Sequence, residues 1–557
     1  MNAEPSRSDA IKTSFYNGAL AGFISLGFAF LIRLGGYSPF PPEAALQYFL
    51  RFVPASIEEP AVQSLGDLAG ELGLAIATTI TIIVYGLFAV LFQNTFSSRL
   101  AKFNSLKSTE RFLLYSLIPW AFFGLIVLPL AGVSTFGINS PFAVGSSTWI
   151  VFPITLLLSQ MVYALVLQWE FKSSLNPAVR EMVAEKREGE ESVPTITSRR
   201  AFIERGVITF GAVIFLALSL NRILPSALSQ GQSGSTLGGG TPINLALAPE
   251  IFSDPRLALL VDSEVTKNDS FYRVAIDLFD PSVDGGTWQL QLNGLVANQK
   301  NYSLDQLMKL PLTEQYNTFE CVSNLVNGNL IGNAQWSGFK ISDLLSDAGG
   351  ASPNAKYIVF YSVDGYSVDL PLSKALMSDS MLAYGMNGVT LPQKHGYPLR
   401  AVIPGLYGMM SAKWINRIEL VDSPYSGYWQ TRDWSPIGVV QTLAFIMVPQ
   451  DGGSASLKQY NGSVLLGGVA YAGDRGISKV EVSTDQGKTW QEAQLKPAIS
   501  NITWRLWAFD WHPTSTGTYS IYARATDGTG ALQTSQEQGN FPNGATGYAI
   551  TTVYVES

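Results

Sequence analysis

The segment FECVSNLVNGNLIGNAQWSG (319–338) surrounds Cys321, the single cysteine in a chain of 557 residues. Its neighbours are Asn, Ser and Gly rather than an apolar run, which is unusual for a cysteine that only fills a core, although composition alone favours an inert thiol. A lone thiolate can also act as a nucleophile beside a base, or as the one protein ligand of a metal that brings its other ligands. A single cysteine excludes an internal disulfide, a thiolate zinc finger, a CxxCH haem attachment and a four-cysteine iron–sulfur cluster.

The two histidines, His395 and His512, leave little room for a His-built metal site. His395 is the candidate base for a Cys/His hydrolase, but it lies in HGYPLR (395–400), which looks more like a phosphate-binding turn. Residues 1–222 contain no histidine, so we expect no bis-histidine haem in that part of the chain.

The sequence around Cys321 has a mixed helix and strand pattern from about residue 258 onward. Strands are expected at 287–296 and as a hairpin over 357–372 that turns at Asp364-Gly365. Short helices are expected at 303–310, with Ser303 as cap, and at 341–350. Past about 455 the helical periodicity ends, and short alternating segments at 479–493, 504–511 and 517–527 predict a β-sandwich.

The first 222 residues are much more apolar than the rest. Four runs are long enough to cross a bilayer and a shorter fifth follows; they lie at 14–32, 72–93, 112–133, 148–168 and 206–220. The fifth run can also be a buried core helix, because 15 uncharged residues are close to the length of one. Over the whole chain, 47% of residues are apolar and only 14% are charged, which excludes a disordered protein.

Lys and Arg in the connecting loops predict the orientation of these spans. Twelve lie in 1–13, 94–111 and 169–201, and only two in 33–71 and 134–147. Positive charge favours the cytoplasmic side, so we expect a multi-pass protein of the cell membrane with everything beyond 222 outside the cytoplasm. The Gly/Ser-rich stretch SALSQGQSGSTLGGGT (226–241) is typical of a flexible tether.

The fifth run is preceded by SRRAFI (198–203), which resembles a twin-arginine export signal. That pathway carries proteins already folded around a cofactor, so the resemblance implies a cofactor loaded before export. The net charge of −7 excludes a basic groove, and we expect no nucleic-acid partner.

Residues from about 258 to the end resemble the sulfite oxidase family of molybdopterin enzymes. The matching motifs are NDSFYR (268–273), ECVSN (320–324), WSGFKISDLL (336–345), HGYPLR (395–400), YGMMSAKW (407–414) and SGYWQTRDW (426–434). The tail resembles the Ig-like dimerisation domain that closes these chains, through GISKVEVSTDQGKTW (476–490), RATDGTG (524–530) and Asn543-Gly544-Ala545.

The resemblance implies that the Cys321 thiolate completes the coordination of a molybdenum held by the dithiolene sulfurs of one pterin. It also implies that polar and basic residues hold the pterin and its phosphate, namely Asn268, Tyr272, Ser362, His395, Arg400, Ser411 and Lys413. Arg273 is the candidate for a catalytic cation. Sulfite-oxidising members carry arginine shortly after the ligand cysteine, whereas Val322, Ser323, Asn324 and Leu325 follow here, which leaves a neutral or reducible oxo substrate as open as sulfite.

We therefore expect a multidomain chain: an α-helical transmembrane bundle of about five spans (1–222), a linker (223–257), an α+β molybdopterin domain (258–440) and an Ig-like β-sandwich (441–557). The expected function is membrane-anchored, molybdopterin-dependent, two-electron oxygen-atom transfer on a small substrate, without haem or an iron–sulfur cluster. The expected partners are a separate electron carrier (cytochrome or quinone), the lipid bilayer and a second copy in a homodimer. The alternatives are a cofactor-free binding module of the same fold and a Cys/His hydrolase.

Overall fold

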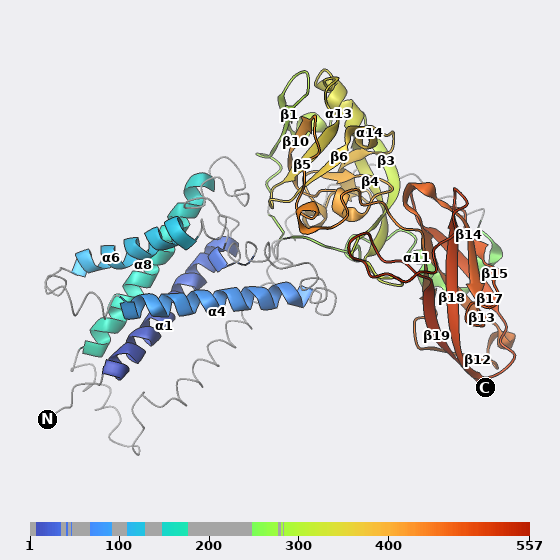
Figure 1. Cartoon of the computed structure of the whole chain (residues 1–557), viewed down its shortest axis with the longest axis horizontal. Coiled ribbons are helices and arrows are strands. Elements are labelled where there is room, and N and C mark those ends of the chain that lie inside the picture. The colour runs from blue at the N-terminus through green and yellow to red at the C-terminus, as the bar shows by residue number, and fades with distance from the viewer. Residues whose placement is uncertain are drawn as a thin grey trace, which may run out of the picture. The chain divides into compact units, whose positions relative to one another are not determined.

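The computed structural model describes residues 7–34, 40–42, 46, 67–91, 108–127, 148–175, 248–276, 280–281 and 283–557. The chain divides into two compact units, Met1–Ser233 and Gly234–Ser557, which are described one at a time (Figure 1). The twin-arginine-like segment, the fifth apolar run and the expected linker up to residue 247 lie outside the described residues.

The first unit consists of long helices. They are α1 (Arg7–Leu34), α4 (Asp67–Leu91), α6 (Ser108–Phe122), which continues as a π-helical turn over Phe123–Val127, and α8 (Thr148–Leu175). Helix α1 packs against α4 and α8, and α8 also packs against α6 (Figure 1). Gly22 permits the close approach of α1 and α4, because a Cβ there would lie 2.5 Å from the Cβ of Tyr85.

Within the described residues, two of the expected spans are long and apolar enough to cross a membrane, Ile11–Ile32 and Leu72–Leu91. Both carry large apolar side chains on their exposed faces, among them Ile24 on α1 and Ile76 on α4. The apolar part of α8, Pro153–Gln168, is shorter than the ~20 residues that a span needs, and α6 is 15 residues long. The prediction of five spans is therefore too high for the described part of the chain, which supports two.

The second unit begins with short helical turns at Glu250–Ser253, Pro255–Leu257 and α11 (Ala258–Asp262), and then forms what we call the central domain. One sheet of this domain has the order β2-β1-β10-β5-β6. Its strands are β1 (Gln289–Gly294), β2 (Lys300–Ser303), β5 (Tyr357–Ser362), β6 (Ser367–Pro371) and β10 (Ile415–Val421). Strands β1 and β10 are parallel and the other neighbours are antiparallel.

The other sheet of the central domain has the order β3-β4-β7-β8, with β9 paired to β7. The strands are β3 (Thr313–Glu320), β4 (Ile331–Lys340), β7 (Met381–Met386), β8 (Val389–Thr390) and β9 (Arg400–Val402). Three short helices follow strands: α12 (Leu304–Leu307), α13 (Ile341–Asp347) and α14 (Leu372–Ala375).

The structure confirms several elements that were predicted from local sequence signals, and it shows the hydrogen bonds behind them. Ser303 caps α12 by accepting a hydrogen bond from the Gln306 amide (3.3 Å), and the Gln306 side chain returns the bond to the Ser303 amide (2.9 Å). The β5-β6 hairpin turns at Asp364-Gly365, where Asp364 Oδ1 accepts from the Tyr366 amide at 3.0 Å and Gly365 has a φ of 84°.

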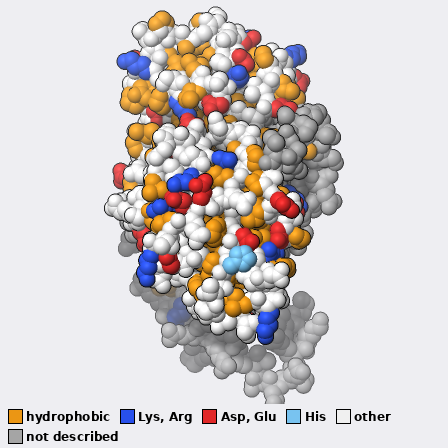
Figure 2. Space-filling view, turned by 90° about the vertical axis from the view of Figure 1, so that its right-hand side faces the viewer, with side chains coloured by type: hydrophobic (Ala, Val, Ile, Leu, Met, Phe, Trp, Pro, Cys, Tyr) orange, Lys and Arg blue, Asp and Glu red, His pale blue; other side chains and the backbone are white. Residues whose placement is uncertain are grey.

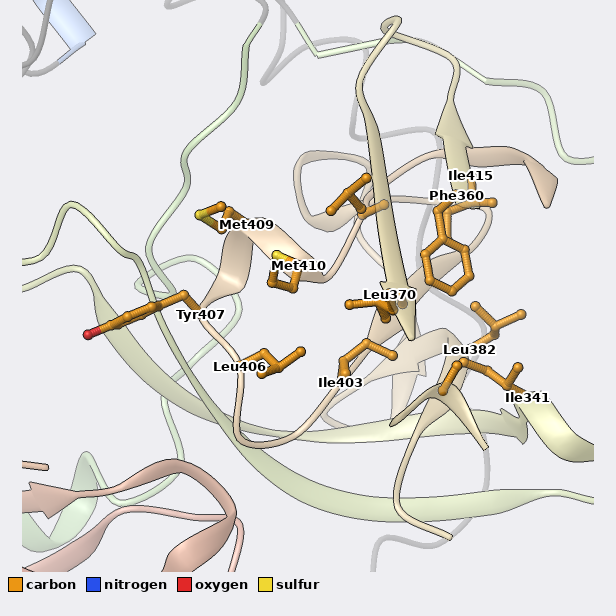
Figure 3. Close-up of a cluster of buried hydrophobic side chains, with 14 of the residues drawn as sticks. Ile341, Phe360, Leu370, Leu382, Ile403, Leu406, Tyr407, Met409, Met410 and Ile415 are labelled. Carbon is orange, nitrogen blue, oxygen red and sulfur yellow. The ribbon is translucent and has the colours of Figure 1, made fainter. Parts of the chain in front are cut away.

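A shared apolar core joins the two sheets of the central domain. Figure 3 shows Phe360 and Leu370 from the first sheet beside Leu382 from the second, with Ile341 of α13 and Ile403 close by. All five belong to one cluster of buried side chains. This core holds β3, β5 and β9 in fixed relative positions, and three of the candidate site residues lie at or next to the ends of these strands: Cys321, Ser362 and Arg400.

The last part of the chain, which we call the C-terminal domain, has two sheets around one apolar core. The first contains β11 (Leu443–Val448), β13 (Val464–Tyr471), β17 (Arg505–Trp511) and β16 (Gln494–Leu495). The second contains β12 (Gly453–Ser456), β19 (Ala549–Glu556), β18 (Gly517–Asp527), β14 (Ile477–Ser483) and β15 (Gln491–Glu492). The expected strands at 504–511 and 517–527 are confirmed, and 479–493 corresponds to β14, a turn and β15.

The C-terminal domain packs against the central domain through buried polar contacts. Lys496 Nζ contacts both carboxylate oxygens of Glu264 at 2.6 and 2.8 Å, and both side chains are almost fully buried. The Tyr471 hydroxyl donates to the Thr318 carbonyl of β3 at 2.7 Å. On the face shown in Figure 2, acidic and basic side chains are interspersed among apolar ones.

Candidate functional site

Cys321 is the first residue after β3 and begins the loop 321–330, which leads into β4. Its amide donates to the Leu330 carbonyl at 2.9 Å, which closes the loop, and its carbonyl accepts from the Asn324 amide at 3.0 Å. The Cys321 side chain is 7% exposed, and its Sγ lies 3.0 Å from the Ser323 hydroxyl. The thiol is thus held on a closed loop beside a polar partner rather than inside an apolar core.

Asn324 fixes the shape of this loop from within. Its Nδ2 donates to Glu320 Oε1 and its Oδ1 accepts from the Leu330 amide, both at 3.0 Å. A Cβ at Gly328 would lie 2.3 Å from Asn324 Oδ1, so only glycine fits there. The sequence placed Asn324 in a motif, but its bonds to both ends of the loop become evident only in the fold.

Glu320 is a buried carboxyl next to Cys321 that the sequence did not single out. It is 1% exposed, and among the described residues its Oε2 has no hydrogen-bond partner. Burial raises the pKa of Glu320 to about 8, because the carboxylate is poorly solvated there, and the Asn324 bond offsets only part of this effect. Glu320 is therefore protonated at neutral pH.

Changing Glu320 to Gln should make the stability of the protein less dependent on pH. The folded protein holds the Glu320 proton more tightly than the unfolded chain, whose pKa is 4.5, so wild-type stability falls as pH rises from there through about 8. We expect Glu320→Gln to melt several degrees above wild type at pH 8 and close to it at pH 5, measured by tryptophan fluorescence in detergent. Equal differences at both pH values would show that the carboxyl does not titrate in this way.

Arg400 is a buried guanidinium at the start of β9. It is 5% exposed and its Cζ lies 4.7 Å from the ring centres of both Phe319 and Trp336. Its Nη1 donates to the His395 carbonyl at 3.0 Å, and no carboxylate of the described residues forms an ion pair with it. Burial lowers the pKa of Arg400 to about 10, so it still carries its charge at neutral pH. A buried cation without a carboxylate is well suited to bind an anionic ligand.

His395 and Asn268 are brought together at 2.6 Å, between His395 Nε2 and the Asn268 carbonyl. Burial lowers the pKa of His395 to about 3, so the ring is neutral and its Nε2 must donate to this carbonyl, which leaves Nδ1 as an acceptor. The side chain of Asn268 accepts from Asn387 Nδ2 at 2.8 Å. A ring whose pKa is lowered to about 3 is a poor general base at neutral pH, so His395 does not support a Cys/His hydrolase.

Lys413 and Ser362 add polar groups from two further segments. Lys413 Nζ donates to the Val274 carbonyl at 2.9 Å and lies 4.2 Å from the ring centre of Trp414; burial lowers its pKa. Ser362 ends β5, and among the described residues its buried Oγ has no hydrogen-bond partner. A buried hydroxyl of this kind is suited to a polar ligand, because leaving it unpaired costs free energy.

Two further expected residues, Ser411 and Arg273, already have partners within the protein. Ser411 Oγ already accepts from the Ile403 amide at 3.2 Å. Arg273 forms an ion pair with Asp280 through Nε and Nη2, at distances of 2.9 to 3.1 Å, so its charge is matched and it is a weak candidate for a free catalytic cation. Asp280 was not anticipated from the sequence.

Two tyrosines share the surroundings of the thiol, Tyr272, which is half-buried, and Tyr366, which is buried. Burial raises the pKa of Tyr272 well above its ordinary value, and the charges of Cys321 and Arg400 also act on it, so Tyr272 lies near both of these expected residues. Tyr366, which follows the β5-β6 turn, also experiences the charge of Cys321, and its hydroxyl donates to the Met409 carbonyl at 2.5 Å. Sequence reasoning missed Tyr366 because a tyrosine after a turn resembles any half-buried strand residue.

Together these residues fit a molybdopterin. A soft thiolate suits a metal that already has sulfur ligands, a planar buried guanidinium and a nearby ammonium suit a phosphate, and an unpaired hydroxyl suits a pterin edge. No group of three or more His, Cys, Asp or Glu that could hold a metal ion alone occurs in the described part of the chain. The site therefore suits a metal that arrives with most of its own ligands.

Comparisons with known proteins agree with this interpretation. Residues 278–429 match the oxidoreductase molybdopterin binding domain, and residues 435–541 match the Mo-co oxidoreductase dimerisation domain.

Among curated proteins, the chain is 31% identical to sulfite oxidase of Arabidopsis thaliana over 286 residues, which cover 43% of this chain and 72% of that protein. It is 30% identical to mitochondrial sulfite oxidase of Rattus norvegicus over 322 residues, 49% of this chain and 58% of that protein. It is 34% identical to an uncharacterized oxidoreductase of Bacillus subtilis over 143 residues, 26% of this chain and 70% of that protein. The chain thus spans little more than half the length of the rat relative. Its central and C-terminal domains belong to the sulfite oxidase family of molybdopterin oxidoreductases.

Proposed function

We propose that this protein is a molybdopterin-dependent oxidoreductase that passes an oxygen atom to or from a small substrate in a two-electron reaction. The observation that carries the proposal is that Cys321, which follows β3, shares its surroundings with Arg400, a buried guanidinium that lies 4.7 Å from the ring of Phe319 on β3 and has no carboxylate partner among the described residues. When bound, the molybdenum cofactor supplies the centre that accepts and returns the two electrons.

The residues of this chain would bind and orient the cofactor. Cys321 would ligate the metal, and Arg400 and Lys413 would neutralise the phosphate. Neutral His395, Asn268, Tyr272, Ser362 and Ser411 would line the pterin. The Nδ1 acceptor of His395 matches a pterin N–H, and the unpaired Ser362 hydroxyl can either donate or accept.

Buried aromatic side chains would keep water from the reacting atoms. The pKa values of Tyr272, Tyr366 and Tyr407 all respond to the charge of Cys321; Tyr366 and Tyr407 are buried and Tyr272 is half-buried. In Figure 3 the Tyr407 ring points away from the apolar cluster, and its hydroxyl accepts from the Gln441 amide at 3.2 Å. A dry pocket strengthens the electrostatic interactions that position a polar substrate.

The electrostatics of the pocket support a neutral oxo substrate, such as a sulfoxide, at least as well as sulfite. No arginine follows Cys321 within four residues, and Arg273 is occupied by Asp280. If Arg400 and Lys413 neutralise the cofactor phosphate, these two cations would not be available to a sulfite dianion.

Metal and pterin analysis tests the proposed activity against the cofactor-free alternative. Protein purified in detergent should contain molybdenum and pterin in equal amounts. A folded protein without either would favour a membrane-tethered binding module of the same fold.

We further propose that α1 and α4 anchor the chain in the cell membrane and that the redox unit lies outside the cytoplasm. The length and apolar character of the two helices, the loop bias of Lys and Arg and the twin-arginine-like segment at 198–203 support this location. Electrons would then pass to or from a separate cytochrome or quinone, because one cysteine and two histidines offer few ligands for a haem or an iron–sulfur cluster. The match to a dimerisation domain supports a homodimer, and the two-sheet C-terminal domain is compatible with an Ig-like fold.

Single cysteines introduced at Ser105 and Ser233 in a Cys321→Ser background should distinguish the two sides of the membrane. The excess of Lys and Arg in 94–111 predicts that position 105 is cytoplasmic and position 233 is not. In intact cells an impermeant thiol reagent should label position 233 and spare position 105, while both should react after lysis. Labelling of 105 and not of 233 in intact cells would reverse the proposed topology.

A further inference from the structure

The sulfur of Cys321 has a hydroxyl neighbour that no part of the proposed mechanism has used. Ser323 Oγ lies 3.0 Å from Cys321 Sγ, and either atom can donate while the sulfur carries a proton. A sulfur bound to a metal has no proton, so in the loaded protein the Ser323 hydroxyl must be the donor. A hydrogen bond to a metal-bound thiolate withdraws charge from the sulfur and changes the reduction potential of the metal.

Ser323 is itself held by a residue far away in the sequence. The side chain of Asn540, in the C-terminal domain, donates from Nδ2 to the Ser323 carbonyl at 2.8 Å. Asn540 is 5% exposed and its own carbonyl accepts from the Gly544 amide at 2.7 Å. Next to it, the rings of Phe541 and Trp434 meet edge to face with centres 5.2 Å apart. The donor to Ser323 is therefore a buried side chain whose backbone is held by a hydrogen bond of its own.

The C-terminal domain also holds the far part of the same loop. Asn327 donates from Nδ2 to the Ile550 carbonyl and accepts at Oδ1 from the Ile446 amide, both at 2.9 Å. Ile446 and Ile550 lie on β11 and β19, which belong to different sheets of that domain. The loop that carries Cys321 is thus attached to the C-terminal domain at two points.

The strand that leads to Cys321 is attached in the same way. The Thr318 amide donates to the Ile502 carbonyl at 3.2 Å, and the Thr318 hydroxyl accepts from the Trp504 amide at 2.9 Å. The residues before and after Cys321 in the sequence therefore both contact the C-terminal domain. That domain, which matches a family model named for dimerisation, thus also holds the thiol in position.

We propose that Ser323 is a positioning residue that hydrogen-bonds the metal-bound sulfur of Cys321, and that Asn540 holds Ser323 in place, so that the C-terminal domain is part of the redox site. This inference rests on the proposed function, in which Cys321 ligates molybdenum.

Ser323→Ala should lower the reduction potential of the molybdenum without loss of metal or pterin. Without the hydroxyl the thiolate donates more charge, which favours the oxidised metal. Since hydrogen bonds to charged groups contribute about tenfold or more to an equilibrium, we expect about a tenfold change in the ratio of oxidised to reduced metal at a fixed potential. That change corresponds to about 59 mV for a one-electron couple. Ser323→Thr keeps the hydroxyl and should retain the wild-type potential and Mo(V) paramagnetic signal.

Asn540→Ala tests the second half of the proposal without touching the sulfur. It should shift the Mo(V) signal and the potential in the same direction as Ser323→Ala but by less, because the hydroxyl stays present in a less fixed loop. The matched control is Gln441→Ala, since the Gln441 side chain donates to the Asn543 carbonyl at 3.3 Å in the same region but does not reach the loop. Far-UV circular dichroism and melting curves report whether each variant folds.

The outcomes separate this inference from the proposed function. A wild-type protein without molybdenum would refute the proposed function itself. A wild-type protein with a Mo(V) signal that Ser323→Ala leaves unchanged would refute the inference alone. If Ser323→Ala fails to fold or to bind the cofactor, the Asn540→Ala variant provides the test. An unchanged reduction potential in Asn540→Ala, or a shift equal to that in Gln441→Ala, would overturn the inference.

Discussion

Arg400→Ala should yield a folded protein that has lost most of its pterin and molybdenum together. Arg400 is a buried cation of the site that lies against the neighbouring rings of Phe319 and Trp336 and has no carboxylate partner among the described residues. Removing one partner of a buried charged pair costs about 2–5 kcal/mol, and every 1.4 kcal/mol is a tenfold change in affinity. We therefore expect cofactor affinity to fall by about 30-fold to a few thousand-fold, measured as pterin fluorescence after oxidation and molybdenum content per protein.

Two further variants test whether the loss of cofactor in Arg400→Ala is due to the lost guanidinium at this site. Arg400→Lys keeps the positive charge but replaces the planar fork with a point charge, so it should retain part of the cofactor. Arg417→Ala is the matched control, because Arg417 also lies against an aromatic ring, Tyr361, but is paired with Glu419 on β10. It should load normally. Full loading of Arg400→Ala would mean that the phosphate is bound elsewhere.

Cys321→Ser should retain the pterin but lose oxygen-atom transfer. Serine has nearly the volume of cysteine and can keep the contact with Ser323, so the closed loop and the fold should survive. Its oxygen is harder and far less acidic than sulfur, which makes it a poor ligand for a metal with soft sulfur neighbours. Partners that only orient metal ligands contribute 10–100-fold, so loss of the ligand itself should lower turnover by more than about 100-fold.

The Mo(V) paramagnetic signal distinguishes this loss from a general defect. It should change in Cys321→Ser, while Ser346→Ala, at an exposed position on α13 of the same domain, should preserve both signal and turnover. An unchanged signal in the serine variant would remove Cys321 from the metal.

The sequence predicts those parts of the fold that depend on neighbours along the chain. The Ser303 cap, the turn at Asp364-Gly365 and the strand after it are set by bonds that span two or three residues. Cys321 is recognisable as unusual because its local neighbours are polar. These features depend only on residues that are close together in the chain, so they can be predicted from a single sequence.

Features that depend on long-range packing could not be predicted in this way. Asn540 and Ser323 are separated by 217 positions, and Glu320 looks like any strand-end carboxylate until burial is known. The ion pair with Asp280 neutralises the charge of Arg273, which the sequence alone presents as an available cation. For the described residues the expected number of spans was too high, because the regular part of α6 ends at Phe122 and the apolar part of α8, Pro153–Gln168, is shorter than a span needs.

X-ray absorption at the molybdenum edge tests the central claim most directly, because it counts the sulfur atoms bound to the metal. If Cys321 ligates the molybdenum of a bound pterin, wild-type protein should show one more sulfur neighbour than Cys321→Ser, in which a lighter oxygen neighbour should take its place. An identical sulfur shell in the two proteins would contradict the account.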